Sequence, residues 1–174
     1  MDWSRALFQV IDLQSFSSLW YWMAVAVVWS SVSHYVLGVP YDMIQRARRN
    51  GGQAEQDLHD MVRICVNRLL HISHAAGMIL LGFACFLLSS LCVMGFWYGA
   101  ELAQAVFLIA FPLSLVGALS LSTARAIAAT APEGEDLYSA LNKHRFWTQT
   151  IGMIAIFITA MYGMYQNLDV VRGL

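Results

Sequence analysis

Four long apolar segments dominate the pattern of hydrophobic and polar positions. They cover about residues 19–39, 75–98, 102–121 and 146–165, and none of them contains Asp, Glu, Lys or Arg. About 20 mostly apolar residues in a helix cross the roughly 30 Å hydrocarbon core of a bilayer. The pattern therefore predicts an all-α membrane protein, a four-transmembrane-helix bundle that forms one membrane domain over residues 1–174.

Composition supports this class and excludes others. Hydrophobic residues make up 59% of the chain and charged residues 12%, about half the charged share of soluble domains. Ten Lys and Arg against eleven Asp and Glu give no basic field that would attract nucleic acid. No basic segment with a following apolar core and small-residue cleavage site opens the chain, so we expect no cleavable signal peptide and a true first span.

Basic residues cluster in the two long connections, residues 40–74 and 122–145. These connections hold eight of the ten Lys and Arg residues. By the positive-inside rule both connections are cytoplasmic, which puts the termini and the short turn at Glu101 on the opposite side. We therefore expect an N-out, C-out topology.

The first connection has a helical pattern in its second half. A helix from Ala54 through Trp97 would be about 65 Å long, twice the hydrocarbon thickness, so an amphipathic cytoplasmic helix extends the second span, straight or bent near Ser73. Its apolar face must be covered by lipid headgroups, by the other connection or by a partner. The apolar positions at helical spacing are Leu58, Met61, Val62, Cys65, Val66 and Leu69.

The second connection mixes helix and turn signals. The third helix is expected to continue to Thr130, Pro132 and Gly134 break it, and residues 135–145 form a short helix with acids at its start and bases at its end. Pro112 inside the third span is expected to kink it, because proline removes a backbone donor. Small residues in the spans are expected to serve helix packing, namely Gly77, Gly82, Gly117, Ala118, Gly152, Ala155 and Ala160.

Four of the five histidines share one expected membrane level, and they are His34, His71, His74 and His144. Imidazoles on facing helices ligate haem iron or another metal. The same shared depth also follows from the exclusion of polar groups from hydrocarbon, and the Glu-x-x-His pairs of a di-iron bundle do not recur. We therefore expect no cofactor and no metal, with haem b at these histidines as the less favoured alternative.

No pattern of a catalytic site occurs, so we expect a protein that is not an enzyme. The serines have no His and Asp in a nucleophile arrangement, and no Gly-rich phosphate loop is present. Cys65, Cys85 and Cys92 form no CxxC pair, so no disulfide framework is expected. The candidates for a functional surface are on the cytoplasmic side, where they contact headgroups or an acidic partner: Arg46, Arg48, Arg49, Leu58, Met61, Val62 and Arg63.

Three stretches carry a family resemblance: FSSLWYWMAVAVVWSSVSHYVLGVPYDM, DMVRICVNRLLHISH and HRFWTQTIGMIAIFITAMYGMYQN. They resemble a family of uncharacterised polytopic inner-membrane proteins of alphaproteobacteria, chiefly the Rhodobacter and Roseobacter group, often labelled "component of SufBCD complex". The resemblance covers most of the chain and implies a bacterial inner-membrane location. The label implies iron-sulfur cluster assembly, but the three cysteines lack cluster-ligand spacing, so no site residue is transferred.

Three functional hypotheses follow. The favoured one is a non-catalytic accessory, assembly or scaffold subunit of a larger bacterial inner-membrane complex, whose partners are the lipid bilayer and either other proteins or further copies of the chain. The first alternative is a redox membrane anchor that binds haem b or quinone. The second alternative is a small oligomeric channel or carrier, which the lack of an intramembrane carboxylate disfavours.

Overall fold

A computed structural model describes residues 16 and 18–172, with side chains up to residue 168. The described part is all-α, as predicted, except for one short hairpin that the sequence did not predict. In chain order its elements are α2 (Leu19–His34), β1 (Tyr35–Val36), β2 (Val39–Pro40), α3 (Tyr41–Asn50), α4 (Gln53–Cys92), the π-helical η2 (Val93–Trp97), α5 (Glu101–Thr130) and α6 (Glu135–Arg172).

Three helical segments are long and apolar enough to cross a membrane. They are Gln53–Trp97, which joins α4 and η2, then α5, and α6 up to Leu168. This confirms the membrane class. The fourth expected span is different, because α2 has only 16 residues and is therefore about 24 Å long at 1.5 Å per residue. The predicted helix over residues 19–39 is thus wrong at its C-terminal end.

A β-hairpin ends α2 at His34. Tyr35 pairs with Pro40 and Val36 pairs with Val39. Between the strands, Leu37 and Gly38 adopt φ values of +54° and +85°, the left-handed conformation that two-residue hairpin turns of this kind require. Hydropathy alone extends the span through these residues, but the chain turns back here and continues into α3.

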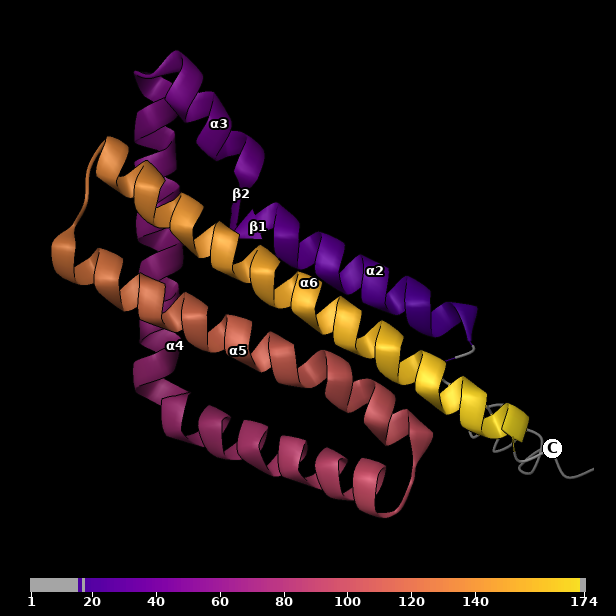
Figure 1. Ribbon diagram of the computed structural model, residues 1–174. Helices are drawn as coiled ribbons and strands as arrows, with labels where there is room; N and C mark the ends of the chain where they lie inside the picture. The colour runs from indigo at the N-terminus through magenta and orange to yellow at the C-terminus, as the bar shows by residue number, and fades with distance from the viewer. Residues whose placement is uncertain (1–15, 17, 173–174) are drawn as a thin grey trace, which may run out of the picture.

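Helix α4 is the long element that the sequence predicted. It is continuous with η2 from Gln53 to Trp97, and Figure 1 shows that it changes direction about half-way along. Its first half crosses the adjoining ends of α5 and α6, and its second half runs beside α5. The amphipathic extension is therefore confirmed, and of the two expected shapes the bent one is found.

The boundaries of α5 and α6 follow the sequence in part. Helix α5 continues to Thr130 and stays helical through Pro112. The chain then breaks where Ala131 and Gly134 take φ values of +40° and +54°, next to Pro132. The short helix expected over residues 135–145 is not separate, however. It joins the apolar stretch at residues 146–165 within the single helix α6, because no residue between them interrupts helix geometry.

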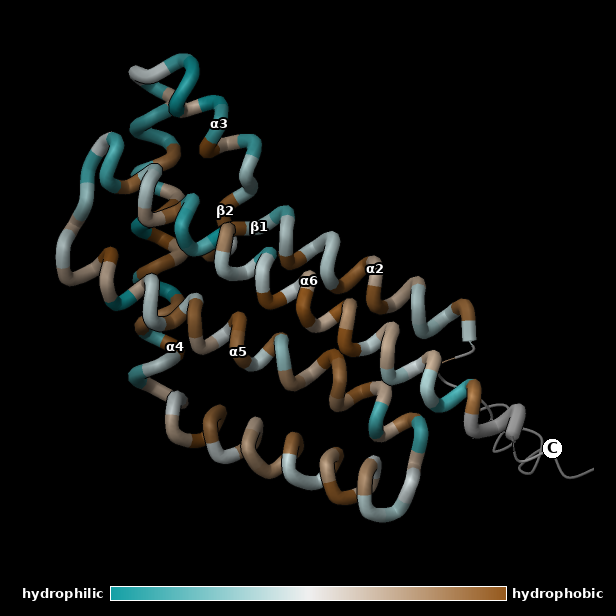
Figure 2. Tube along the Cα trace, in the orientation of Figure 1, coloured by the Kyte–Doolittle hydropathy of each residue, from teal (hydrophilic) through white to brown (hydrophobic). Residues whose placement is uncertain are grey.

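The apolar helices lie side by side as a row. Figure 1 shows the order α2, α6, α5 and the second half of α4, and the packing pairs are α2 with α6, α6 with α5, and α5 with α4. A small cluster that contains Trp29 of α2, Val116 of α5 and Ala155 of α6 holds three of them together. Figure 2 shows that hydrophobic residues dominate this row, while hydrophilic residues gather at one end.

Candidate functional surface at the charged end

The hydrophilic end of the molecule has its own hydrophobic core. We call this part the head; it contains the hairpin, α3, the first half of α4, the end of α5 and the start of α6. Burial of one Leu or Ile side chain stabilises a fold by roughly 1.5–3 kcal/mol, so this cluster holds the head together. Its buried members are Val36, Leu37, Val39, Ile44, Ala47, Leu58, Val62, Val66, Ala124, Ile127, Leu137, Tyr138 and Leu141.

This core corrects one part of the predicted interaction surface. Leu58 and Val62 are only 0% and 3% exposed, and Met61 is half-buried against the same core. Their apolar face is covered by α3, the hairpin and the other connection. Of the three covers that the sequence left open, the chain itself supplies the cover, and these residues do not face a partner.

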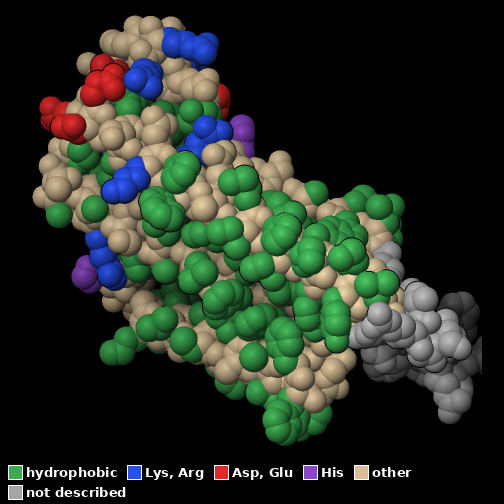
Figure 3. All heavy atoms as spheres, in the orientation of Figure 1, with side chains coloured by type: hydrophobic (Ala, Val, Ile, Leu, Met, Phe, Trp, Pro, Cys, Tyr) green, Lys and Arg blue, Asp and Glu red, His purple; other side chains and the backbone are tan. Residues whose placement is uncertain are grey.

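The four arginines of the predicted surface are exposed. Arg46, Arg48 and Arg49 lie on α3, a helix that was not predicted, although Pro40 before it and Gly51 after it are ordinary boundary signals. Arg63 lies on α4, where its guanidinium is 3.0 Å from the carboxylate of Asp60. Figure 3 shows the charged side chains gathered at the head and hydrophobic side chains over the rest of the visible face.

A groove separates α3 from α6. It has a volume of about 480 Å³ and is lined by Arg48, Glu135, Tyr138, Ser139, Asn142, Lys143 and Phe146. An adjoining hollow of about 210 Å³ shares Arg48, Tyr138 and Asn142 and adds Tyr41, Ile44, Gln45 and Arg49. We call the two together the α3–α6 groove.

One ion pair and one buried phenol determine the electrostatics of this groove. Arg48 faces Glu135 at 3.7 Å, and both side chains are mostly exposed, so the pair contributes little to stability. Burial raises the pKa of the Tyr138 phenol, and the carboxylates of Glu55 and Glu135 add to this effect against the opposing charge of Arg48. The phenol therefore stays protonated near neutral pH and remains a hydrogen-bond donor.

Arg145 fixes α3 to α6 beside the groove. Its guanidinium carbon is 3.5 Å from the centre of the Tyr41 ring, a cation–π contact between the start of α3 and the third turn of α6. This contact, together with the buried head core, holds together the two helices that form the groove walls.

A second cleft lies on another side of the head. It has a volume of about 480 Å³ and is bounded by α4 and the α5–α6 connection, with polar lining residues His59, Asp60, Arg63, Asn67 and Glu133. Because acids and bases alternate along its walls, it presents no single charge to a ligand.

The four candidate histidines do not form one buried site. His34, His71 and His74 are exposed, whereas His144 is buried and its Nδ1 lies 3.2 Å from the hydroxyl of Thr123. His144 precedes the apolar stretch of α6, and burial lowers its pKa, so the imidazole is neutral at neutral pH. Among the residues that the structure describes, no three His, Cys, Asp or Glu side chains are placed to hold a metal ion.

Comparisons with known proteins assign no family. No protein-family model, curated protein or solved structure matches the chain. The charged head and the apolar row are therefore the features from which function can be inferred.

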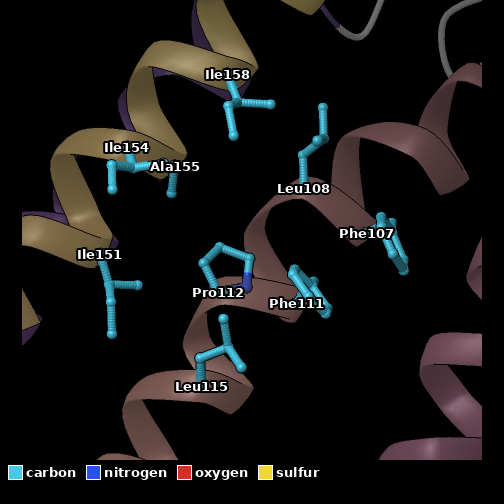
Figure 4. A pocket seen from close by; sticks show the side chains of 9 residues that line it. All are labelled: Phe107, Leu108, Phe111, Pro112, Leu115, Ile151, Ile154, Ala155 and Ile158. Carbon is cyan, nitrogen blue, oxygen red and sulfur yellow. The ribbon is translucent and has the colours of Figure 1, made fainter.

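An apolar groove lies within the row, at Pro112. Figure 4 shows Leu108 and Pro112 of α5 facing Ile151, Ala155 and Ile158 of α6 across it. Its volume is about 210 Å³, and its walls are Phe, Leu, Ile, Pro and Ala side chains. Without a polar group this lining accepts hydrocarbon but cannot orient a headgroup or a quinone ring.

A polar network that was not predicted from the sequence lies at the end of the row opposite the head. Gln104 is buried; its side chain donates to the carbonyl of Gly95 at 2.8 Å and accepts from Gln166 at 2.7 Å. Gln166 also donates to the Tyr162 hydroxyl at 3.1 Å. Through these bonds η2, α5 and α6 are joined. A glutamine inside an apolar segment was the available signal, since such residues join helices in membranes.

Glu101 lies close to this network. Its carboxylate accepts a hydrogen bond from the backbone N–H of Phe16 at 2.9 Å. The residue is half-buried and links the first turn of α5 to Phe16, which precedes α2.

Proposed function

We propose that the chain is a non-catalytic accessory, assembly or scaffold subunit of a larger membrane complex, located in a bacterial inner membrane. In this proposal α2 is a fourth, short span, the termini lie outside and the head lies in the cytoplasm. The observation that supports a subunit role is the free edge of the helix row.

The second half of α4 forms that edge. It packs on α5, and its other side is open, with Met78, Ile79 and Phe86 exposed by 88%, 74% and 70%. Lipid covers such a surface in a bilayer, but an edge helix also offers a complete face for lateral association with another membrane helix. In a closed bundle, this face of α4 would instead be buried in the protein's own core.

The distribution of basic residues supports the orientation. Both long connections lie at the same end of the row, in the head, and they carry eight of the ten Lys and Arg residues. A 16-residue α2 is short for the hydrocarbon core, and local thinning of the bilayer accommodates such a mismatch at modest cost.

The redox alternative receives less support. Haem b needs imidazoles that face a common space, and three of the four candidate histidines are exposed on α2 and α4 whereas His144 is buried in α6. The Pro112 groove has no polar group for a quinone ring. No described feature favours a channel or carrier over a subunit.

The edge of α4 allows a direct test. Phe86 is 70% exposed there, and the photoreactive residue p-benzoylphenylalanine in its place inserts into C–H bonds of any adjacent chain without needing a thiolate. Irradiation of native membranes that contain this variant should cross-link α4 to a neighbouring helix. We expect adducts that contain a second protein, which should also co-purify with the wild-type chain in gentle detergent.

The control carries the same photoreactive residue in place of Phe157, which is 66% exposed on α6, away from the α4 edge. It should reach normal levels in the membrane without forming these adducts. If native mass spectrometry of the extracted wild-type chain shows only the 19.4 kDa monomer and the Phe86 variant forms no adduct, the subunit proposal is wrong. Adducts made only of two copies of the chain would replace it with a homo-oligomer.

A further inference from the structure

We propose that the α3–α6 groove binds the phosphate-bearing headgroup of an anionic phospholipid, with an acyl chain lying along Phe146 and the exposed face of α6. The inference requires only that the chain sits in a bilayer, so it stands apart from the proposed subunit role.

The charges of the groove fit an anion with oxygen acceptors. Arg48 and Arg49 come from α3 and Lys143 from α6, while Glu135 is the carboxylate in the lining and Glu55 acts on Tyr138 from nearby. Neutral donors from α6 stand between these charges, namely Tyr138, Ser139 and Asn142. Arginine and lysine with adjacent hydroxyl and amide donors are the groups that hold a phosphate.

The groove continues into an apolar path. Lys143 and Phe146 are three residues apart and so lie on one side of α6, and Phe146 is 64% exposed. Farther along the same side, Met153 and Phe157 are each 66% exposed. A basic pocket above a strip of exposed hydrocarbon matches the two parts of a phospholipid.

The aromatic residues mark the level of the headgroups. Phe146 and Trp147 stand at the junction of the polar start of α6 and its apolar stretch, and both are exposed. Aromatic rings collect at the membrane interface. An acidic protein segment would use the charges of the groove but not the apolar path, which is why a lipid fits better than a peptide.

Glu135 acts as an internal competitor. Its carboxylate faces Arg48 at 3.7 Å, and a phosphate that approaches Arg48 must displace it. Removal of this carboxylate should therefore strengthen binding, an effect opposite in sign to removal of the basic groups.

The test uses the full chain in detergent with phosphatidylglycerol as the probe. Phosphatidylcholine and glycerol 3-phosphate serve as the zwitterionic and the lipid-free comparisons. Native mass spectrometry counts retained lipid, and the unfolding temperature reports binding, since a ligand that binds the folded state raises it. We expect phosphatidylglycerol to be retained and to raise the unfolding temperature, and the two comparison compounds to do neither at equal concentration.

Matched variants locate the site. R48Q/K143Q should bind phosphatidylglycerol at least tenfold more weakly than R46Q/R63Q, which removes the same charge from outside the groove. E135Q should bind at least threefold more tightly, and E133Q, two residues away and outside the groove, should bind like the wild type. Circular dichroism and lipid-free unfolding temperatures establish that each variant is folded.

Three results would overturn the proposal. One is equal retention of phosphatidylglycerol by R48Q/K143Q and R46Q/R63Q, which would mean that binding follows net charge. Another is full competition by glycerol 3-phosphate at concentrations similar to those of the lipid, which would indicate an anion site without an acyl-chain path. The third is displacement of the lipid by an acidic peptide at lower concentration, which would make the groove a protein-docking site.

Discussion

At the scale of single residues, the glycines of the spans differ in how closely another helix approaches them. The sequence predicted that all of these glycines serve helix packing. A Cβ added at Gly152 would lie 2.8 Å from a ring carbon of Trp29, whereas one added at Gly82 or Gly117 would meet nothing within 4 Å. Only Gly152, of these three, lies where two helices approach closely.

The Gly152→Ala substitution should therefore destabilise the protein. Trp29 is itself buried and its rigid ring cannot move aside easily, so the expected loss is about 1–3 kcal/mol in the free energy of unfolding. Equilibrium unfolding in detergent, followed by tryptophan fluorescence, measures the change.

Gly117→Ala is the matched control. Because nothing lies within 4 Å of the added methyl group, the better helix propensity of alanine, up to about 1 kcal/mol, should leave this variant as stable as the wild type or more so. Equal destabilisation by both substitutions would contradict the α2–α6 contact.

At the scale of elements, the two halves of α4 have different environments. The first half is amphipathic, and its apolar side packs in the head core; the second half is apolar on all sides and exposed beyond α5. The bend between the halves lets one helix serve both. Arg125 of α5 donates to the Ser73 hydroxyl of α4 at 3.3 Å, a contact that ties the end of α5 to α4 at the residue near which the sequence allowed a bend.

Truncation of Leu58 should open the head without removing the spans. Leu58 is completely buried, and Leu→Ala in such a position costs about 2–5 kcal/mol. Hydrogen exchange and limited proteolysis should show faster exchange and cleavage in α3 and the first half of α4, while the protein stays in the membrane fraction.

Ile64→Ala provides the comparison on the same helix. Ile64 is 59% exposed, so its truncation should change stability by no more than about 0.5 kcal/mol. If hydrogen exchange in the head of the Leu58→Ala variant stayed at the wild-type rate, the head core would not be what holds α4 in place.

At the scale of the whole molecule, the structure places both long connections at one end and the α4–α5 turn at the other. This arrangement predicts which positions share a side of the membrane. In a cysteine-free background, a membrane-impermeant maleimide should label Asn50→Cys and Glu133→Cys from the cytoplasmic side. It should label Tyr98→Cys and Leu168→Cys from the opposite side.

If the cysteines at positions 50 and 133 were labelled from opposite sides of the membrane, the two long connections would not lie together in the head. Labelling of all four from the reverse sides would keep the fold and invert the N-out, C-out orientation. The exposed state of Tyr98 makes it a suitable reporter for the turn.

The amino-acid sequence by itself determined the class of the protein, the continuity of α4, the break at Pro132 and the clustering of basic residues. Each of these depends on local hydropathy, local charge or the geometry of one residue type. The end of α2 depended on a local turn at Leu37 and Gly38 that hydropathy did not reveal. Contacts between distant segments decided the rest: the burial of Leu58 and Val62, the exposure of three of the four candidate histidines and the network around Gln104. An apolar face requires burial, but its pattern does not specify which segment will cover it, and only the packed structure makes that choice.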